Sequence, residues 1–256
     1  MNIGAQLYTV RDKCKNNEDL RATFGELKKM GYTSVQVSGF DYDAQTVRDI
    51  ADEFGLHIGL THTGIEDIIQ KTDEVINKHK ILGADVVGIG SPEKYRDEDD
   101  IKVDEMISDL APAVEKIEAA GLKVAFHNHY VEFYDRGGYT VMDVLYEKTN
   151  WNFILDTAWV HYAGDDVVEV INKYKDRLKY VHIKDYSVGG DDIGAVVEGL
   201  CPLYEGKMPM DEVMKALEDV GTVEIAYVEQ DNGPNKENSL EEMRKSINAL
   251  KAKGWI

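Results

Sequence analysis

Histidine, lysine and carboxylate side chains recur in this sequence at the ends of short apolar segments. They occur in Leu60-Thr-His-Thr63, Phe126-His-Asn-His-Tyr-Val-Glu-Phe133, Ile154-Leu-Asp-Thr-Ala-Trp159, His182-Ile-Lys-Asp185 and Tyr227-Val-Glu-Gln-Asp231. Four of the seven histidines, at positions 62, 127, 129 and 182, belong to this set. Imidazole and carboxylate groups together suit a divalent ion such as Mn2+, Zn2+, Co2+ or Fe2+, and both can carry protons near neutral pH. No sequential motif such as HExxH is present, so ligands would have to come from different segments.

The segments that carry these residues predict a repeated strand–helix unit. Eight short runs of β-branched or apolar residues are each followed by apolar residues spaced three and four apart, as in a helix with one buried face. The runs are Ile3–Tyr8, Ser34–Val37, His57–His62, Asp85–Ile89, Lys123–Asn128, Phe153–Asp156, Tyr180–Lys184 and Val223–Gln230. Five predicted helices end at a glycine, which tolerates the left-handed conformation that closes a helix: Gly31, Gly55, Gly83, Gly121 and Gly221. The last helix is expected to begin with a capping box, Ser239-Leu-Glu-Glu242.

Eight such units in 256 residues predict a single α/β domain, a closed (β/α)8 TIM barrel spanning residues 1–256. An open doubly wound sheet would carry a glycine-rich turn after its first strand, and Tyr8-Thr-Val-Arg-Asp12 stands there instead. In a barrel the active site lies at the carboxyl ends of the strands, so the residues above should converge there with Gln6, Tyr8 and Gln36. A long acidic, glycine-rich connection from Asp185 to about Pro209 is a candidate substrate lid.

Composition and charge narrow the class of partner. The net charge is −19 and no basic cluster is present, which argues against nucleic acid and against an anionic membrane surface. No apolar run approaches the roughly 18 residues needed to span a bilayer. Cys14 and Cys201 form no CxxC pair, and the first residues lack the pattern of a secretion signal, so a cytoplasmic protein is expected.

At these motifs the chain resembles the sugar phosphate isomerase/epimerase-like superfamily, the xylose isomerase-like TIM barrels that include ketose 3-epimerases, inosose dehydratases and endonuclease IV. The resemblance covers essentially the whole chain, and Phe126–Phe133 is similar to the HNHxxEF variant of one bacterial branch. The family places one metal ligand at the end of each of strands five to eight. The resemblance carries these ligands over to His127, Asp156, His182 and Glu229. It implies a divalent cation, with Mn2+ expected first and Zn2+, Co2+, Mg2+ or Fe2+ as alternatives.

Two positions depart from the family pattern. The epimerases have a glutamate as the strand-five ligand, where this chain has His127, and many relatives have a histidine where it has Trp159. Imidazole can replace a carboxylate as ligand, so the predicted metal site survives. A mechanism with two glutamates on opposite faces of the substrate is weakened. Glu132 is an alternative strand-five ligand or base, and could equally be an ordinary loop carboxylate.

These residues predict an enzyme that abstracts a proton next to the carbonyl of a small sugar or cyclitol. The predicted catalytic residues are Glu229, His129, Glu132 and Lys184, and the predicted substrate-binding residues are Gln6, Tyr8, His62, Trp159 and Asp185. Trp159 and Tyr8 are expected to form an aromatic wall against the sugar ring, and Asp185 to orient a ligand.

Several functional alternatives stay open at this point. Isomerisation or epimerisation of the sugar competes with β-elimination from an inosose or a 3-keto-glycoside, because His127 replaces one expected glutamate. A sugar-binding barrel without catalytic activity is a second alternative. A DNA-repair endonuclease is a third, which the charge disfavours. Assembly into a homo-oligomer is compatible with each of them.

Overall fold

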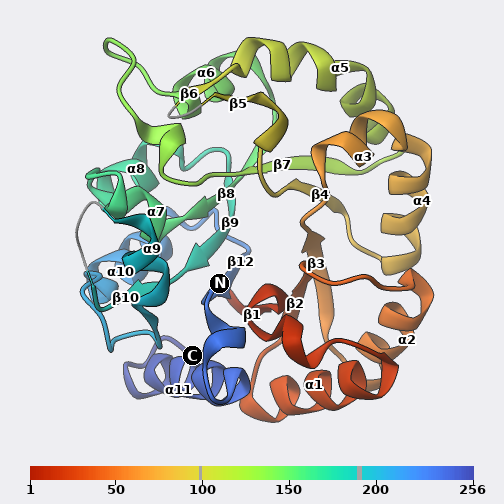
Figure 1. The fold of residues 1–256 in the computed structure, drawn as a ribbon, viewed down its shortest axis with the longest axis vertical. Coiled ribbons are helices and arrows are strands. Elements are labelled where there is room, and N and C mark those ends of the chain that lie inside the picture. Colours follow the sequence, from red (N-terminus) through yellow and green to blue (C-terminus); the bar gives the residue numbers. More distant parts are fainter. Residues whose placement is uncertain (98–99, 189–191) are drawn as a thin grey trace.

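Eight parallel strands close into a barrel, and helices surround it, in the computed structural model (Figure 1). The structure describes residues 1–97, 100–188 and 192–256. Each strand pairs with its neighbours in sequence, and the last pairs with the first, which confirms the predicted (β/α)8 barrel. The barrel strands are β1 (Asn2–Gln6), β2 (Ser34–Val37), β3 (His57–Thr61), β4 (Val86–Ile89), β7 (Lys123–His127), β8 (Asn152–Asp156), β9 (Leu178–Ile183) and β12 (Ile225–Val228).

Helices and two small two-stranded sheets make up the outer part of the molecule. The sheets pair β5 (Arg96–Asp97) with β6 (Asp100–Ile101) and β10 (Asp185–Tyr186) with β11 (Leu200–Cys201). In the described part of the chain, no helix is both long and apolar enough to cross a membrane. The helices are α1 (Asn17–Met30), α2 (Ala44–Phe54), α3 (Ile65–Gln70), α4 (Thr72–Leu82), α5 (Val103–Ala119), α6 (Val141–Lys148), α7 (Thr157–Tyr162), α8 (Val167–Tyr174), α9 (Ile193–Glu198), α10 (Met210–Val220) and α11 (Ser239–Ala252), with short 3-10 helices η1 (Leu7–Lys13), η2 (Glu93–Tyr95), η3 (Val131–Phe133) and η4 (Gly233–Asn235).

The helix ends follow the glycine prediction but not the capping-box prediction. All five glycines that were expected to end helices have positive φ, from +61° at Gly55 to +109° at Gly31. Ser239 does not cap α11, because Asn238 occupies the N-cap position and the Ser239 hydroxyl donates to Asp12 at 3.0 Å instead. A capping box is present at α6, where Thr140 and Asp143 bond each other's backbone N–H groups.

The alternation of side chains along the strands separates an apolar interior from a polar mouth. A layer of buried apolar residues fills the barrel: Leu60, Val86, Ala125, Ile154, Tyr180, Ile225 and Tyr227. Two residues further along the same strands come His62, His127, Asp156, His182 and Glu229. Successive side chains of a strand point to opposite faces, so residues two apart share the interior face. The barrel therefore brings these five residues together above its apolar layer.

The two residues of the predicted aromatic wall do not lie at strand ends. β1 ends at Gln6, so Tyr8 lies in η1 rather than at a strand end, and Trp159 lies in the first turns of α7 rather than on β8. The connection predicted as a lid contains β10, α9 and β11, and α9 contributes Val197 to the wall of the central cavity. Residues 189–191 of that connection lie outside the described residues.

Candidate active site

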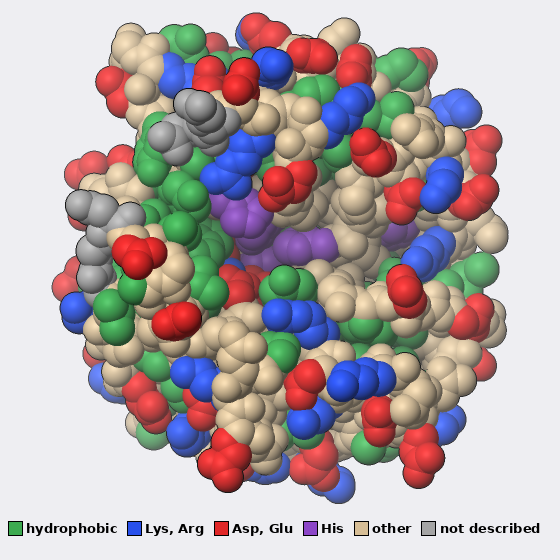
Figure 2. All heavy atoms as spheres, viewed as in Figure 1, with side chains coloured by type: hydrophobic (Ala, Val, Ile, Leu, Met, Phe, Trp, Pro, Cys, Tyr) green, Lys and Arg blue, Asp and Glu red, His purple; other side chains and the backbone are tan. Residues whose placement is uncertain are grey.

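A cavity of about 940 Å³ opens at the carboxyl ends of the barrel strands. Seven residues predicted from sequence line it: Tyr8, His62, His127, His129, Trp159, Lys184 and Glu229. Figure 2 shows histidine side chains gathered at the centre of this hollowed face. The wall of the cavity does not include Gln6, Glu132, Asp156, His182 or Asp185 among its described residues.

Four side chains below the cavity converge closely enough to hold one metal ion. One ligand atom each from His127, Asp156, His182 and Glu229 lies within 4.8 Å of every other. All four residues are buried. These are the four residues that the resemblance implied. His127, Asp156 and His182 lie on β7, β8 and β9, and Glu229 directly follows β12. We call them the tetrad. His62 forms a second group with His127 and His182 that meets the same distance limit.

Hydrogen bonds on the far side of two imidazoles fix which nitrogen faces the cluster. His182 Nε2 lies 2.7 Å from Gln36 Oε1, which accepts, so Nε2 carries the proton. His127 Nδ1 lies 3.1 Å from the carbonyl oxygen of Gly90, which also accepts. Each ring therefore turns its other nitrogen, His182 Nδ1 or His127 Nε2, toward the carboxylates. A metal ion binds imidazole through a nitrogen placed in this way, once that nitrogen carries no proton.

The first turn of α7 orients the Asp156 carboxylate toward the cluster. Its Oδ1 caps that helix, accepting the N–H groups of Ala158 at 3.1 Å and Trp159 at 3.2 Å, which leaves Oδ2 facing the histidines. Asn128, the residue after β7, holds the backbone of Asp156, because its Oδ1 accepts the Asp156 N–H and its Nδ2 donates to the Asp156 carbonyl. Burial raises the pKa of Asp156, but Lys184 and the histidines outweigh burial and hold the pKa below its usual value.

The donor atoms of this cluster fit a cation. Five buried atoms at this point form no hydrogen bond of normal geometry in the described structure: His62 Nε2, His127 Nε2, His182 Nδ1, Asp156 Oδ2 and Glu229 Oε2. His182 Nδ1 and Glu229 Oε2 lie 2.6 Å apart without forming a hydrogen bond of normal geometry. Two electron-pair donors this close need a proton or a metal ion to share. A site rich in imidazole and carboxylate suits Mn2+, Zn2+, Co2+ or Fe2+.

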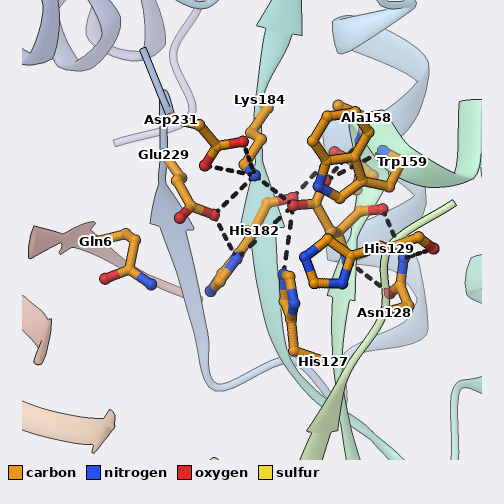
Figure 3. A network of polar contacts seen from close by, with 12 residues as sticks. Gln6, His127, Asn128, His129, Ala158, Trp159, His182, Lys184, Glu229 and Asp231 are labelled. Carbon is orange, nitrogen blue, oxygen red and sulfur yellow. Dashed lines mark hydrogen bonds and ion pairs between the residues drawn. The ribbon is translucent and has the colours of Figure 1, made fainter. Parts of the chain in front are cut away.

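Lys184 lies among three carboxylates at the edge of the tetrad (Figure 3). Its Nζ is 2.7 Å from Asp156 Oδ2, 3.0 Å from Glu229 Oε2 and 3.0 Å from Asp231 Oδ2. Burial lowers the pKa of this lysine, but the carboxylates outweigh burial and raise the pKa well above its usual value. Lys184 is therefore an ammonium group, and the ammonium with three carboxylates leaves a surplus of negative charge that a divalent ion would balance.

Two other predicted catalytic residues lie on the loop after β7. His129 lines the cavity, and burial lowers its pKa to about 3, so it is neutral. Glu132 turns away from the cavity, because its Oε2 accepts the backbone N–H of His129 at 2.8 Å. Burial raises the pKa of Glu132 to about 7. This geometry makes Glu132 a residue that positions His129, and it supports His127 rather than Glu132 as the strand-five ligand.

Asp185 was expected to bind substrate or orient a ligand, but in the structure its carboxylate contacts backbone N–H groups. Its two carboxylate oxygens accept the backbone N–H groups of Tyr186, Tyr204, Gly206 and Met208 at 2.8–3.0 Å. Asp185 therefore organises the connection that follows β9. Gln6 is also turned inward, since its Oε1 accepts the N–H of Tyr8 at 3.2 Å and its Nε2 is buried without a partner in the described structure.

The predicted aromatic wall has both of its members in the cavity lining. Trp159 is 4% exposed, and the Lys184 ammonium lies 5.1 Å from its ring centre. The Arg11 guanidinium stacks on the ring of Tyr8, 3.7 Å from the ring centre. His62 faces His127 and His182 at ring-centre distances of 4.8 and 5.3 Å. Their contact with a sugar remains a prediction.

Three residues that support the site received no role from sequence reasoning. They are Gln36, which sets the His182 tautomer, Asn128, which clamps Asp156, and Asp231, which pairs with Lys184. Gln36 and Asp231 lie at predicted strand ends, and Asn128 lies inside the quoted HNH segment. Their positions near strand ends could have marked them as site residues. Their partners lie on other strands, so their roles could not be predicted from the sequence.

Comparison with known proteins gives one family for most of the chain. Residues 24–253 match the family described as xylose isomerase-like TIM barrel. The inosose dehydratase of Clostridium perfringens is 27% identical over 161 residues, which cover 56% of this chain and 54% of that protein. The chain thus aligns with about half the length of this curated relative.

Solved structures share the whole barrel. A sugar phosphate isomerase/epimerase from Parabacteroides distasonis has a TM-score of 0.80 at 21% identity, with 100% of this chain and 95% of that chain covered. The IolI protein, solved with a zinc atom, has a TM-score of 0.76 at 14% identity, with 98% and 97% covered. At these identities the likeness is one of fold.

Proposed function

The chain belongs to the xylose isomerase-like TIM barrel family, and from this premise we propose a divalent-metal-dependent enzyme that removes a proton next to a substrate carbonyl. The substrate class is a small keto-sugar or cyclitol. The observation that carries the proposal is the convergence of five buried imidazole and carboxylate atoms, none with a hydrogen bond of normal geometry in the described structure, at a cavity of about 940 Å³. Buried polar atoms are costly to leave unpaired, so a native site that collects them has a ligand for them.

The metal would be held by His127, Asp156, His182 and Glu229, with Mn2+ as our first choice and zinc supported by the IolI structure. A bound divalent cation supplies Lewis-acid polarisation of a carbonyl oxygen, which makes the neighbouring carbon-bound proton more acidic. Gln36 and Gly90 occupy the other nitrogens of His182 and His127, so His182 Nδ1 and His127 Nε2 are the atoms available to the ion.

The chain's own residues would move the proton. Glu229 is ionised, because His182 and Lys184 outweigh burial and hold its pKa well below the usual value, so it can accept a proton. His129 is neutral and lines the cavity, but its low pKa makes it a weak base, so its role in proton transfer stays a prediction. Lys184 is the protonated member and would donate to, or hold, a substrate oxygen that gains charge. Trp159 would pack against the apolar face of the ring.

Elimination of a β-substituent is the second candidate function. Two features favour it: the similarity to an inosose dehydratase, and the presence of His127 where a second glutamate would serve an epimerase. A single carboxylate base together with a protonated Lys184 is an acid–base pair suited to removing a proton and protonating a leaving hydroxyl. Membership of the narrower HNHxxEF branch stays a prediction.

Hydrogen exchange with solvent tests the proposal. The protein loaded with Mn2+ is incubated in D2O with ketoses, inososes and 3-keto-glycosides. We expect deuterium uptake at the carbon next to the carbonyl, and EDTA should abolish it. Uptake with return of a stereoisomer indicates an isomerase or epimerase, and uptake with loss of a β-substituent indicates a lyase. Binding without exchange for every ligand that binds would contradict the proposal and favour a sugar-binding barrel.

A further inference from the structure

The cavity extends beyond the metal ligands to a second wall. There it is lined by Thr63, Glu66 and Asp67, which follow β3, and by Ser91, Glu93 and Lys94, which follow β4. These residues follow β3 and β4 and include the first turn of α3. They are away from the tetrad, and the proposed chemistry does not use them. We call these six residues the outer wall.

Thr63 ends a chain of hydrogen bonds whose direction can be worked out. The buried His79 has its Nδ1 2.7 Å from the carbonyl oxygen of Val75, which can only accept, so Nδ1 carries the proton. Burial lowers the pKa of His79 to about 4, so the ring is neutral and its Nε2 has only a lone pair. Thr61 Oγ1 lies 2.8 Å from Nε2 and must donate its hydrogen there.

The direction of the Thr61 hydrogen bond then fixes that of Thr63. Thr61 Oγ1 also lies 2.8 Å from Thr63 Oγ1, and its single hydrogen is already given to His79. Thr63 must therefore donate to Thr61. A hydroxyl has one hydrogen and two lone pairs, so Thr63 has only lone pairs left for the cavity that it lines. Thr63 is therefore a hydrogen-bond acceptor toward the cavity, and this role is fixed by the ring of His79, sixteen residues away in the chain.

The part of the outer wall that follows β4 also presents acceptors. Ser91 Oγ donates to Glu93 Oε1 at 3.0 Å, so this hydroxyl also has only lone pairs to offer. Glu66, Asp67 and Glu93 are carboxylates, and the two acids in the first turn of α3 offset the positive end of that helix. Lys94 is occupied by Asp109 and the Tyr95 hydroxyl at 3.1 Å each.

We propose that the outer wall recognises hydroxyl groups of the substrate as hydrogen-bond donors, that Thr63 is a specificity-determining residue, and that the substrate is an unphosphorylated polyol ketone. This rests on the proposed function, in which the carbonyl end lies at the tetrad. A phosphate group brings only acceptor oxygens and negative charge, and would face the acceptors and carboxylates of the outer wall. Among the described residues that line the cavity, the lysines are Lys94 and Lys184, and each already pairs with at least one carboxylate.

Calorimetric binding to the Mn2+-loaded protein tests the charge preference. The probes are D-fructose, D-ribulose and D-xylulose, each beside its own phosphate monoester. We expect each neutral ketose that binds to do so at least about tenfold more tightly than its ester, the effect of about 1.4 kcal/mol of binding free energy. An ester that binds as tightly as its neutral partner, or more tightly, would overturn the inference.

Variants at Thr63 test the residue itself. Thr63→Val keeps the shape but removes the acceptor, while Thr63→Ser keeps the hydroxyl and is the matched control. We expect Val to weaken ketose binding by roughly tenfold and Ser to leave it within about twofold. Equal thermal unfolding midpoints for the two variants exclude a folding effect. Equal affinity of Thr63→Val and Thr63→Ser would overturn the assignment of Thr63.

These outcomes separate this inference from the proposed function. Ketose binding without deuterium exchange, weakened by Thr63→Val, would contradict the enzyme but support the hydroxyl-binding wall. Exchange that proceeds as fast with phosphate esters as with neutral ketoses would support the enzyme and overturn the unphosphorylated substrate.

Discussion

At His182 a single neighbour sets which ring nitrogen faces the metal site. Gln36 Oε1 accepts the Nε2 hydrogen at 2.7 Å, so Nδ1 is the nitrogen that faces Asp156 and Glu229. Asn128 does comparable work for Asp156, which it holds by two backbone bonds. The tetrad is thus oriented by amide side chains that do not belong to it.

Loss of either His182 or its partner should weaken metal binding to different degrees. We expect His182→Ala to lose the ion under conditions where the wild type holds one per chain. Gln36→Leu should keep the ligand but weaken metal affinity by about 10–100-fold, since the imidazole is no longer oriented. Metal analysis and competition with a fluorescent chelator measure both effects. Asp176→Asn, at an exposed aspartate, is the control. Full occupancy in His182→Ala would show that this ligand is misassigned.

Glu132 predicts a dependence of stability on pH. Burial raises its pKa from 4.5 to about 7, so the folded protein keeps a proton on Glu132 that the unfolded chain has already released. The unfolded chain therefore binds fewer protons between these values, and this residue makes the free energy of unfolding fall as the pH rises from about 4.5 to about 7.

Glu132→Gln cannot titrate, and its side-chain oxygen can still accept the N–H of His129. Relative to the wild type, we expect the variant to gain stability by roughly 3 kcal/mol as the pH rises through this window. Urea unfolding in EDTA, at a series of pH values, gives the difference directly. Parallel stability curves for the two proteins would contradict the raised pKa.

At the scale of elements, Asp185 holds together the connection between β9 and α10. Its carboxylate accepts four backbone N–H groups from residues 186–208, and Gly206 must be a glycine because an added Cβ would lie 2.1 Å from Asp185 Oδ1. β10, which begins at Asp185, pairs with β11. The connection is thus anchored at the rim of the barrel, where its α9 contributes to the cavity wall.

Asp185→Asn should loosen this connection. The amide nitrogen cannot accept, so two of the four bonds are lost and we expect a cost of roughly 2–4 kcal/mol. Hydrogen exchange of the amides at Tyr204, Gly206 and Met208 should accelerate more than exchange in the barrel strands. Asp176→Asn serves again as the exposed control. Unchanged protection at these three amides would show that Asp185 does not anchor the connection.

At the scale of the whole molecule, closure of the barrel depends on residues that meet across its interior. Tyr227 of β12 reaches across to β3, where an added Cβ at Gly59 would lie 2.1 Å from its hydroxyl oxygen. The same hydroxyl lies 3.3 Å from Ser34 Oγ on β2. This packing lies directly below the site, because Glu229 follows Tyr227 by two residues at the end of β12.

Gly59→Ala should therefore destabilise the barrel by roughly 1–3 kcal/mol through overpacking. The double variant Gly59→Ala/Tyr227→Phe should recover part of this loss, because the phenylalanine ring lacks the oxygen that the new methyl group meets. Urea unfolding of the two single variants and the double variant gives the coupling energy. Strictly additive effects would show that Gly59 and Tyr227 do not meet in the interior.

The sequence by itself determined the barrel and the residues at its mouth. Strand side chains alternate with period two, so the apolar Tyr180 and the polar His182 and Lys184 must share one face wherever the strand lies. Glycines such as Gly31 marked the helix ends because a positive φ is a local property of the backbone. The family resemblance added the tetrad, and the convergence of its four residues agrees with it.

Only the tertiary structure decided which groups these residues face. Gln36 lies 146 positions from His182, and no local pattern could pair them. Glu132 and Asp185 have the composition of catalytic groups, yet one holds the His129 backbone and the other holds a connection. Thr63 became an acceptor through a relay that begins in α4. The physical reason is that hydrogen-bond direction, tautomer and pKa depend on distances across the fold, whereas periodicity and backbone conformation depend on neighbours in the chain.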